Sequence, residues 1–234
     1  MPKRYWWVII SYILMQFSGV VFAPILYNLF PITKVEAVSY WSIISFILGV
    51  IIVLLLMKPD IKQGLHQRDR TSKTQLILWT ILGVFMAFFA QFLANFIQIM
   101  VFGVKPGSEN TQAIMNITRA TPLFMIIPIF AAPILEEVIF RKIIFGTLYK
   151  RTNFLIAAIL SAVIFGFIHG EPQHILVYGS MGLVFAYLYV ETKRIIVPII
   201  AHMAMNAFVV IAQYNMDPAE IERQLNELQN ILHL

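Results

Sequence analysis

Two adjacent glutamates and an arginine interrupt an apolar part of the sequence, at Glu136, Glu137 and Arg141. In a helix Glu137 and Arg141 are four residues apart and share a face, which predicts an ion pair that holds helices together. Glu136 is rotated by about 100° from that face. It has no charge partner on its own helix, so we expect a catalytic carboxyl; the alternative is a protonated, hydrogen-bonded core carboxyl. Pro128 and Pro133 are expected to kink or restart this helix just before the pair.

Three more polar side chains lie within or at the end of apolar stretches, at His169, His202 and Asn206. His202 and Asn206 are four residues apart and therefore face the same way on a helix. A single histidine or asparagine in a membrane helix commonly hydrogen-bonds to a neighbouring helix and is structural. Two on one face favour a site, because polar side chains inside a membrane mark functional positions by default.

The composition of the chain indicates the elements that must position these residues. The 234-residue sequence is 59% hydrophobic and 12% charged, with a mean hydropathy of +0.79. Soluble domains carry about 25% charged residues. We therefore predict an all-α, polytopic transmembrane helical bundle of about seven spans, at Tyr5–Phe30, Val38–Met57, Gln75–Phe102, Thr121–Tyr149, Phe154–Ile168, Ile175–Val190 and Ile195–Gln213.

We expect a single membrane domain over residues 1–234, with three N-terminal spans in 1–120 and a catalytic helical core in 121–213. Residues 214–234 are predicted to form an amphipathic helix, capped by Asp217 with Pro218 at its first position and Glu220 completing a capping box. Its apolar stripe consists of Ile221, Leu225, Leu228 and Leu232. This helix is expected to lie on the membrane surface; the alternative is pairing with another helix.

The basic residues predict the orientation in the membrane. With a cytoplasmic N-terminus, one side holds Lys3, Arg4, Lys58, Lys62, Arg68, Arg70, Lys73, Lys150, Arg151, Lys193 and Arg194, and the other holds Lys34, Lys105, Arg119 and Arg223. The positive-inside rule then places the N-terminus in the cytoplasm. The net charge of +5 is thereby explained by topology, so we expect contact with the lipid bilayer and no nucleic-acid partner. Trp6, Trp7, Trp41 and Trp79 lie near span ends, as interfacial anchors do.

The depths of the polar residues are compatible with one site. Counted from the basic ends of their spans, Glu136, His169 and Asn206 lie roughly 22, 24 and 18 Å deep. His202 lies roughly 12 Å deep, one turn closer to the cytoplasm. The four side chains are therefore expected to meet in one buried polar cavity.

Several intramembrane chemistries are excluded by the residues present. The chain has no cysteine, which excludes a thiolate nucleophile. It has no HExxH motif, which a site-2-type zinc protease needs, and no aspartate within a predicted span, where a presenilin-type aspartyl protease needs two. The segment from Gly179 to Gly182 approaches the serine turn of rhomboid proteases but places Ser180 one residue early. Gly179, Gly182 and Ala186 are better explained as a close-packing helix face.

The remaining motifs resemble a known family. Glu136 to Arg141 is EExxxR, Phe165 to His169 is FxxxH, and His202 to Asn206 is HxxxN. In this order they resemble the CAAX protease and bacteriocin-processing (CPBP, or Abi) family of intramembrane glutamyl proteases. The resemblance covers about residues 121–213.

The resemblance implies an intramembrane endopeptidase that cleaves membrane-associated peptides or proteins. Glu136, assisted by His169, would activate water, while His202 and Asn206 would stabilise the oxyanion; Glu137 and Arg141 would hold the site together. It implies no cofactor. Eukaryotic relatives cleave prenylated CAAX tails, and prokaryotic ones are linked with pheromone or bacteriocin maturation, immunity and membrane-protein regulation. The first span resembles a signal peptide, but Pro24 follows its only small-residue site at Ala23 and should block cleavage, so we expect an uncleaved anchor. This anchor and the compact size favour a bacterial cell membrane.

Two alternatives stay open at this point. One carboxylate and two histidines can bind catalytic zinc with water at the fourth position, here Glu136, His169 and His202. The chain could also be a non-catalytic immunity or scaffold protein that binds a peptide or a membrane partner.

Overall fold

The computed structural model describes residues 1–65 and 71–232, so Arg68 and Arg70 of the topology prediction lie outside the described residues. Within that part of the chain every regular element is a helix. The longer helices are α1 (Lys3–Leu29), α2 (Lys34–Leu65), α3 (Lys73–Phe102), α4 (Glu109–Ala120), α7 (Phe154–Phe167), α8 (Ile175–Thr192), α9 (Ile196–Asn215) and α10 (Pro218–Leu232).

Among the described residues, six helical segments are long and apolar enough to cross a membrane: Lys3–Leu29, Lys34–Gln63, Lys73–Phe102, Pro122–Tyr149, Pro172–Thr192 and Ile196–Asn215. The remaining expected span is α7, which has 14 residues. At 1.5 Å per residue it is about 21 Å long, shorter than the hydrocarbon core of about 30 Å. The predicted all-helical bundle is confirmed, with six candidate spans and the shorter α7 among the described residues.

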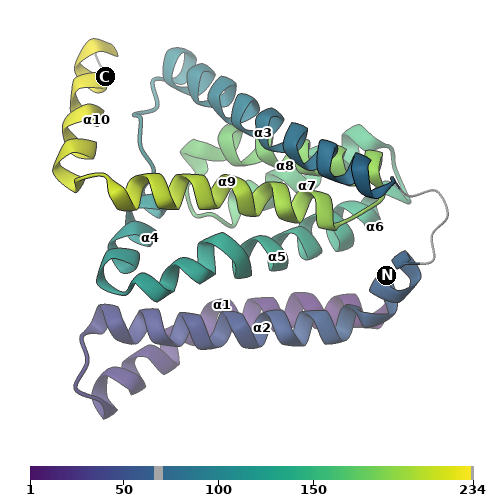
Figure 1. Cartoon of the computed structure of the whole chain (residues 1–234), viewed down its shortest axis with the longest axis horizontal. Coiled ribbons are helices and arrows are strands. Elements are labelled where there is room, and N and C mark those ends of the chain that lie inside the picture. The colour runs from purple at the N-terminus through teal and green to yellow at the C-terminus, as the bar shows by residue number, and fades with distance from the viewer. Residues whose placement is uncertain (66–70, 233–234) are drawn as a thin grey trace.

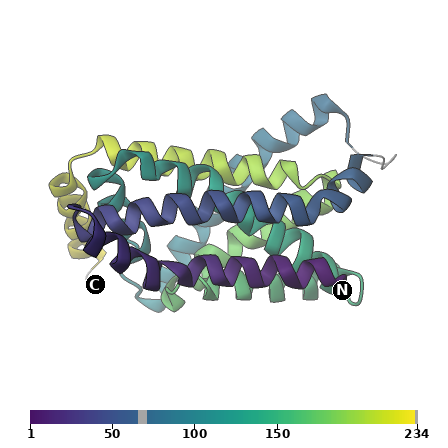
Figure 2. The same ribbon diagram turned by 90° about the horizontal axis from the view of Figure 1, so that it is seen from below.

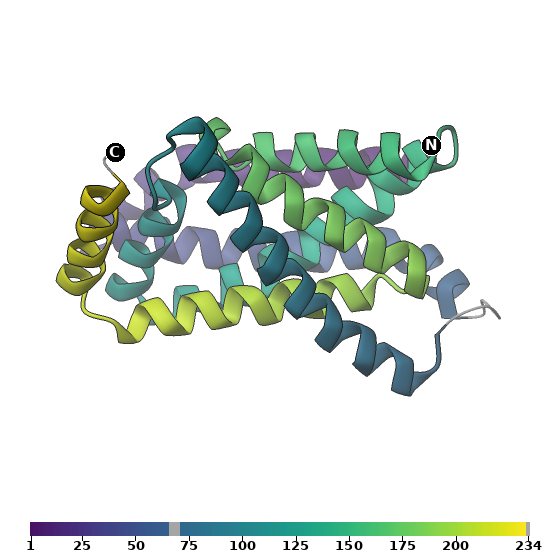
Figure 3. The ribbon, with the colours of Figure 1, turned by 90° about the horizontal axis from the view of Figure 1, so that it is seen from above.

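The helices form layers around a central segment (Figure 1). Helices α1 and α2 run side by side as a hairpin along one flank, which Figure 2 shows from below. Helices α7 and α8 cover the other side, and α3 crosses α8 and α9 obliquely (Figure 3). The amphipathic α10 lies at the end of the bundle opposite the N-terminus and runs across the direction of the spans.

The central segment changes its winding several times. A 3-10 turn, η1 (Pro122–Met125), is followed by a π-helix, η2 (Ile127–Ala131), the α-helix α5 (Ala132–Glu136), a second π-helix, η3 (Glu137–Phe145), and α6 (Gly146–Tyr149). Pro128 lies in η2 and Pro133 at the start of α5, so the interruption expected from the prolines takes the form of a change in winding. Glu136 and Glu137 lie on either side of the junction between α5 and η3.

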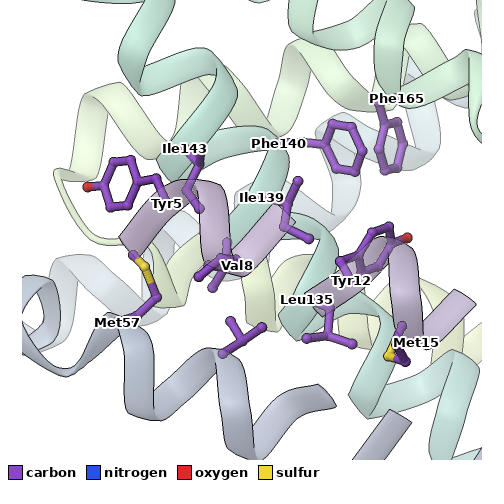
Figure 4. Close-up of a cluster of buried hydrophobic side chains, with 12 residues drawn as sticks. Tyr5, Val8, Tyr12, Met15, Met57, Leu135, Ile139, Phe140, Ile143 and Phe165 are labelled. Atoms are coloured by element: carbon purple, nitrogen blue, oxygen red, sulfur yellow. The ribbon is translucent and has the colours of Figure 1, made fainter. Parts of the chain in front are cut away.

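A hydrophobic cluster fixes the rotation of this central segment (Figure 4). Side chains of α1 and α2 pack there on Leu135, Ile139 and Ile143, and all three are at most 3% exposed. Inside a membrane such packing rests on van der Waals contact, since lipid tails are as apolar as leucine. The cluster therefore holds one face of the segment against the α1–α2 hairpin, while Glu137 contacts α9 and Glu136 lines a cavity beside α1.

Close packing brings α7 and α8 together on the other side. A Cβ added to Gly182 would lie 3.1 Å from the Cβ of Ala162, closer than ordinary packing allows, and Ala186 is 1% exposed. The predicted small-residue face is thus confirmed for Gly182 and Ala186. It is wrong for Gly179, where an added Cβ would meet no atom within 4 Å.

Two shorter helices complete the fold. Helix α4 was not predicted; it is amphipathic, and the Ser108 hydroxyl caps it by accepting from the amide of Thr111. Helix α10 begins where the sequence predicts, with Asp217 accepting from the amide of Ala219. The Glu220 carboxylate accepts hydrogen bonds from Arg223 and Gln224. Glu220 therefore takes part in a surface ion pair and not in the expected capping box.

Candidate active site

A cavity of about 330 Å³ lies between the central segment and the surrounding helices. Glu136, His169, His202 and Asn206 all line it, so the four side chains singled out from the sequence meet in one place. The wall also includes Tyr12 and Gln16 of α1, residues that the sequence analysis did not single out. The catalytic roles of these four side chains stay predictions.

Glu137 and Arg141 form the ion pair expected from their spacing. The Arg141 Nε lies 3.0 Å from the Glu137 Oε2, and both side chains are 0% exposed. The terminal guanidinium nitrogens of Arg141 have no hydrogen-bond partner among the described residues. They lie over aromatic faces instead, with the guanidinium carbon 4.6 Å from the ring centre of Phe165 and 5.5 Å from that of Phe185.

Glu137 makes a second contact that the sequence analysis missed. Its Oε1 lies 3.0 Å from the Nδ1 of His202. Since a carboxylate beside a buried arginine is an acceptor, Nδ1 of His202 carries the proton. Glu137 therefore links Arg141 on its own segment to His202 on α9. Because it binds Nδ1 of His202, the Nε2 of that ring points away from Glu137.

The other ring nitrogen of His202 faces the second glutamate. Its Nε2 lies 3.8 Å from the Oε2 of Glu136, longer than a hydrogen bond. The imidazole is also stacked on Phe185, with ring centres 4.9 Å apart and planes 22° apart. His202 is thus held by Glu137 on one edge and Phe185 on one face, and Glu136 is its neighbour across the cavity.

His169 is oriented by its own helix end. Its Nδ1 lies 2.7 Å from the carbonyl oxygen of Phe165, which can only accept, so Nδ1 is the protonated nitrogen of the neutral ring. Nε2 then keeps a lone pair. The ring stacks on Tyr178 of α8, with centres 4.0 Å apart and planes 22° apart.

A buried carboxylate in the turn between α7 and α8 supports that tyrosine. Glu171 is 4% exposed and accepts hydrogen bonds from the hydroxyls of Tyr178, at 2.6 Å, and Ser108, at 2.8 Å. It also accepts a hydrogen bond from the backbone N–H of Asn110 at 3.2 Å. Burial alone would raise the pKa of Glu171, but these hydrogen bonds outweigh it and lower the pKa below its usual range. Nothing in the sequence selects Glu171 as a functional residue, because a carboxylate in a loop does not stand out from the polar residues around it.

Asn206 is placed by the irregular winding of the central segment. Its Nδ2 donates to the carbonyl oxygen of Pro128 at 2.8 Å. Pro128 lies in the π-helix η2, where the regular helical bonding pattern changes. One amide hydrogen of Asn206 is therefore committed to the backbone, and the second is available at the cavity wall.

Comparison with known proteins identifies the family. The sequence model of the type II CAAX prenyl endopeptidase Rce1-like family matches residues 118–208. YdiL of Bacillus subtilis (strain 168), provisionally named a membrane peptidase, is 44% identical over 239 residues, which cover 99% of this chain and 98% of YdiL. The chain belongs to the CAAX protease family. MroQ of Staphylococcus aureus (strain USA300), named a membrane-embedded CAAX protease, is 32% identical over 97% of this chain and 95% of MroQ. No solved structure matches the chain.

Membership of the CAAX protease family makes this chain an integral membrane protein of a peptidase family. The matched residues 118–208 include every member of the EExxxR, FxxxH and HxxxN motifs. The three side chains considered as alternative zinc ligands, Glu136, His169 and His202, do not form a metal-binding group among the described residues.

Proposed function

We propose that this CAAX-protease-family chain hydrolyses peptide bonds of membrane-associated peptides or proteins without a metal. Glu136 acts as the general base: its carboxylate takes a proton from water as the water oxygen attacks the carbonyl carbon of the scissile bond. The same proton then goes to the leaving amine as the carbon–nitrogen bond breaks. His169 assists, because the lone pair on its Nε2 can accept a hydrogen bond from the same water.

His202 and Asn206 stabilise the negative charge that develops on the carbonyl oxygen. Asn206 offers its second amide hydrogen. His202 can donate through Nε2 only as an imidazolium, since Nδ1 already donates to Glu137; its positive charge then lies between the carboxylates of Glu136 and Glu137. Glu137 and Arg141 are positioning residues in this proposal, acting through His202.

The observation that supports this function best is the placement of His202 between the two adjacent glutamates. Its Nδ1 lies 3.0 Å from Glu137 and its Nε2 lies 3.8 Å from Glu136, within a cavity that His169 and Asn206 also line. A core histidine with a structural role needs one such partner. Glu136 lies next to the His202 ring without a direct hydrogen bond to it, so its carboxylate can contact a third group.

The proposed orientation has the N-terminus in the cytoplasm of a bacterial cell. It rests on the basic residues that gather at one end of the described helices, around the start of α1 and the loops after α6 and α8. Helix α4, whose residues Asn110 and Thr111 line the cavity, would then lie toward the outer face.

The decisive experiment replaces Glu136 with glutamine. Its side chain is 13% exposed, and its ion-pair contact among the described residues, with His202 Nε2, is 3.8 Å long, so the Glu136→Gln protein should fold normally. Membrane peptides from cells with either form, compared by mass spectrometry, should include cleavage products that only the unsubstituted protein generates. Glu191→Gln, which changes an exposed glutamate at the end of α8, is the matched control.

The same pair of proteins tests the scaffold alternative. A non-catalytic scaffold would tolerate Glu136→Gln, because shape and hydrogen bonding largely survive, and the two peptide profiles would then agree.

Chelation tests the zinc alternative. Purified protein should keep its turnover after strong chelation. Loss of turnover that added zinc restores would replace the metal-free mechanism with the zinc-dependent one.

A further inference from the structure

A second cavity, of about 320 Å³, lies at the end of the bundle where α1 begins. Its walls come from the start of α1, the end of α2, the η3–α6 segment and α8, and it shares no lining residue with the candidate active site. The charged residues around it are Arg4, Asp60, Lys142, Lys150 and Arg151. The cavity therefore has four basic side chains and one acidic side chain.

The one carboxylate is already occupied on both oxygens. Arg4 Nε donates to Asp60 Oδ2 at 2.7 Å, and the Tyr5 hydroxyl donates to Oδ1 at 2.6 Å. The Asp60 side chain is 6% exposed. Lys142, Lys150 and Arg151 have no carboxylate oxygen within 4 Å among the described residues. Asp60 interacts most closely with Arg4 and also electrostatically with Lys142. Among the described residues around the cavity, one carboxylate therefore faces four basic side chains, an excess of three positive charges.

Lys142 makes this imbalance costly. It follows the buried Arg141 on η3, within a membrane span, and its side chain is only partly exposed. Its Nζ lies 6.0 Å from the ring centre of Tyr189, at the limit of a cation–π contact, and Asp60 is near enough for an electrostatic interaction but forms no ion pair with it within 4 Å. A partly buried ammonium group is stable when an anion lies beside it. The empty space next to Lys142 is where such an anion fits.

The position of the cavity along the membrane normal indicates the source of the anion. Trp6 and Trp7, which directly follow Arg4 and Tyr5, are 56% and 59% exposed, as expected for side chains anchored among lipid headgroups. Basic pockets between membrane helices at this level are suited to phosphate-bearing headgroups. Hydroxyl and amide donors for phosphate oxygens are also present, on Thr147, Tyr189 and Gln63.

We propose that this cavity binds the headgroup phosphate of an anionic phospholipid. The excess of three positive charges distinguishes such a lipid from a zwitterionic one, whose headgroup amine or choline would be repelled. Free phosphate has the same chemistry, but it lacks the acyl chains that would lie against the apolar helix surfaces beside the cavity. This inference does not depend on the proposed hydrolysis, because no residue is shared between the two sites.

Native mass spectrometry of the purified full-length protein tests the proposal, with phosphatidylglycerol and phosphatidylcholine offered at equal concentration. The unsubstituted protein should retain phosphatidylglycerol selectively. Removing one charge near a membrane surface weakens such binding by about fivefold, so Lys142→Gln should bind about fivefold more weakly. The combined Lys142→Gln, Lys150→Gln and Arg151→Gln protein should bind about 125-fold more weakly.

Lys34→Gln with Lys105→Gln is the matched control, since it removes two cations at the opposite end of the bundle. If the control weakens binding as much as the cavity variants, the proposed site is wrong. If the Lys142 variants fail to fold, the exposed Lys150→Gln and Arg151→Gln pair alone must weaken binding about 25-fold. Inorganic phosphate is offered to lipid-free protein as a separate arm. Binding as tight as that of phosphatidylglycerol, with the same dependence on Lys142, would assign the site to free phosphate instead.

Discussion

Replacing Glu137 with glutamine should damage both stability and turnover, by separate routes. Glu137 and Arg141 are 0% exposed, so the substitution leaves a fully buried arginine without its counter-charge. Breaking a buried pair in this way costs about 3–5 kcal/mol. With a shift of about 2–4 °C for each kcal/mol in a chain of this size, the melting temperature should fall by about 6–20 °C.

The loss of turnover follows from the second contact of Glu137. The glutamine oxygen can still accept from His202 Nδ1, but it carries no charge to balance an imidazolium. At metal sites, loss of the partner that orients a ligating histidine typically costs about 10–100-fold, and we expect an effect of similar size here. We expect a fall of that size in kcat per folded molecule, measured in detergent with melting temperature recorded on the same samples.

A double substitution separates the two routes. In Glu137→Gln with Arg141→Met, no unpaired charge remains, and methionine fills part of the space between Phe165 and Phe185. Stability should recover in part, while turnover should stay low because His202 still lacks a charged partner. Glu191→Gln again serves as the control, with both quantities unchanged. Recovery of turnover together with stability would refute the positioning role and leave Glu137 as a purely structural strut.

Three further predictions concern other parts of the structure. Asn206→Ala should lower kcat by about 10²–10³ with little change in KM, and it should also cost about 1–3 kcal/mol because the Pro128 carbonyl loses its donor; wild-type turnover per folded molecule would exclude an oxyanion role. The hydrogen bonds that lower the pKa of Glu171 contribute stability above its unfolded pKa of about 4.3, and this contribution is lost as pH falls through the folded pKa. The melting temperature should therefore fall in acid more steeply for the unsubstituted protein than for Glu171→Gln, and parallel curves would contradict the assignment. Single cysteines at the exposed positions Gln63 and Glu191 should react with an impermeant reagent only after the cytoplasmic face is opened, and one at exposed Glu109 should react from outside; the reverse pattern would invert the proposed orientation.

The sequence predicted the features that depend on one helix at a time. Apolar runs located the spans, and four-residue spacing located the Glu137–Arg141 pair. Depth counting brought the glutamate, histidine and asparagine side chains to one level, and the structure places them around one cavity. Each of these inferences uses only local periodicity and the fixed rise of a helix.

The features that were missed depend on contacts between segments or on low hydropathy. The Glu137–His202 contact joins residues 65 positions apart, and nothing in the spacing of either motif indicates it. Helix α4 carries too many polar residues to register as a span, although Ser108 is an ordinary N-cap residue. Glu171 and Tyr178 act on His169 through a turn and a ring stack, which single-helix geometry does not describe.

The π-helical winding of residues 137–145 makes the length of this segment as important as its composition. Each π turn holds one more residue than an α turn, so the chain can shed a residue here only by rewinding to α geometry. A one-residue deletion after Arg141 that is not absorbed by such rewinding would rotate everything that follows by about 100° relative to the glutamates. We expect this stretch to accept many single substitutions on its outer surface and to reject insertions and deletions.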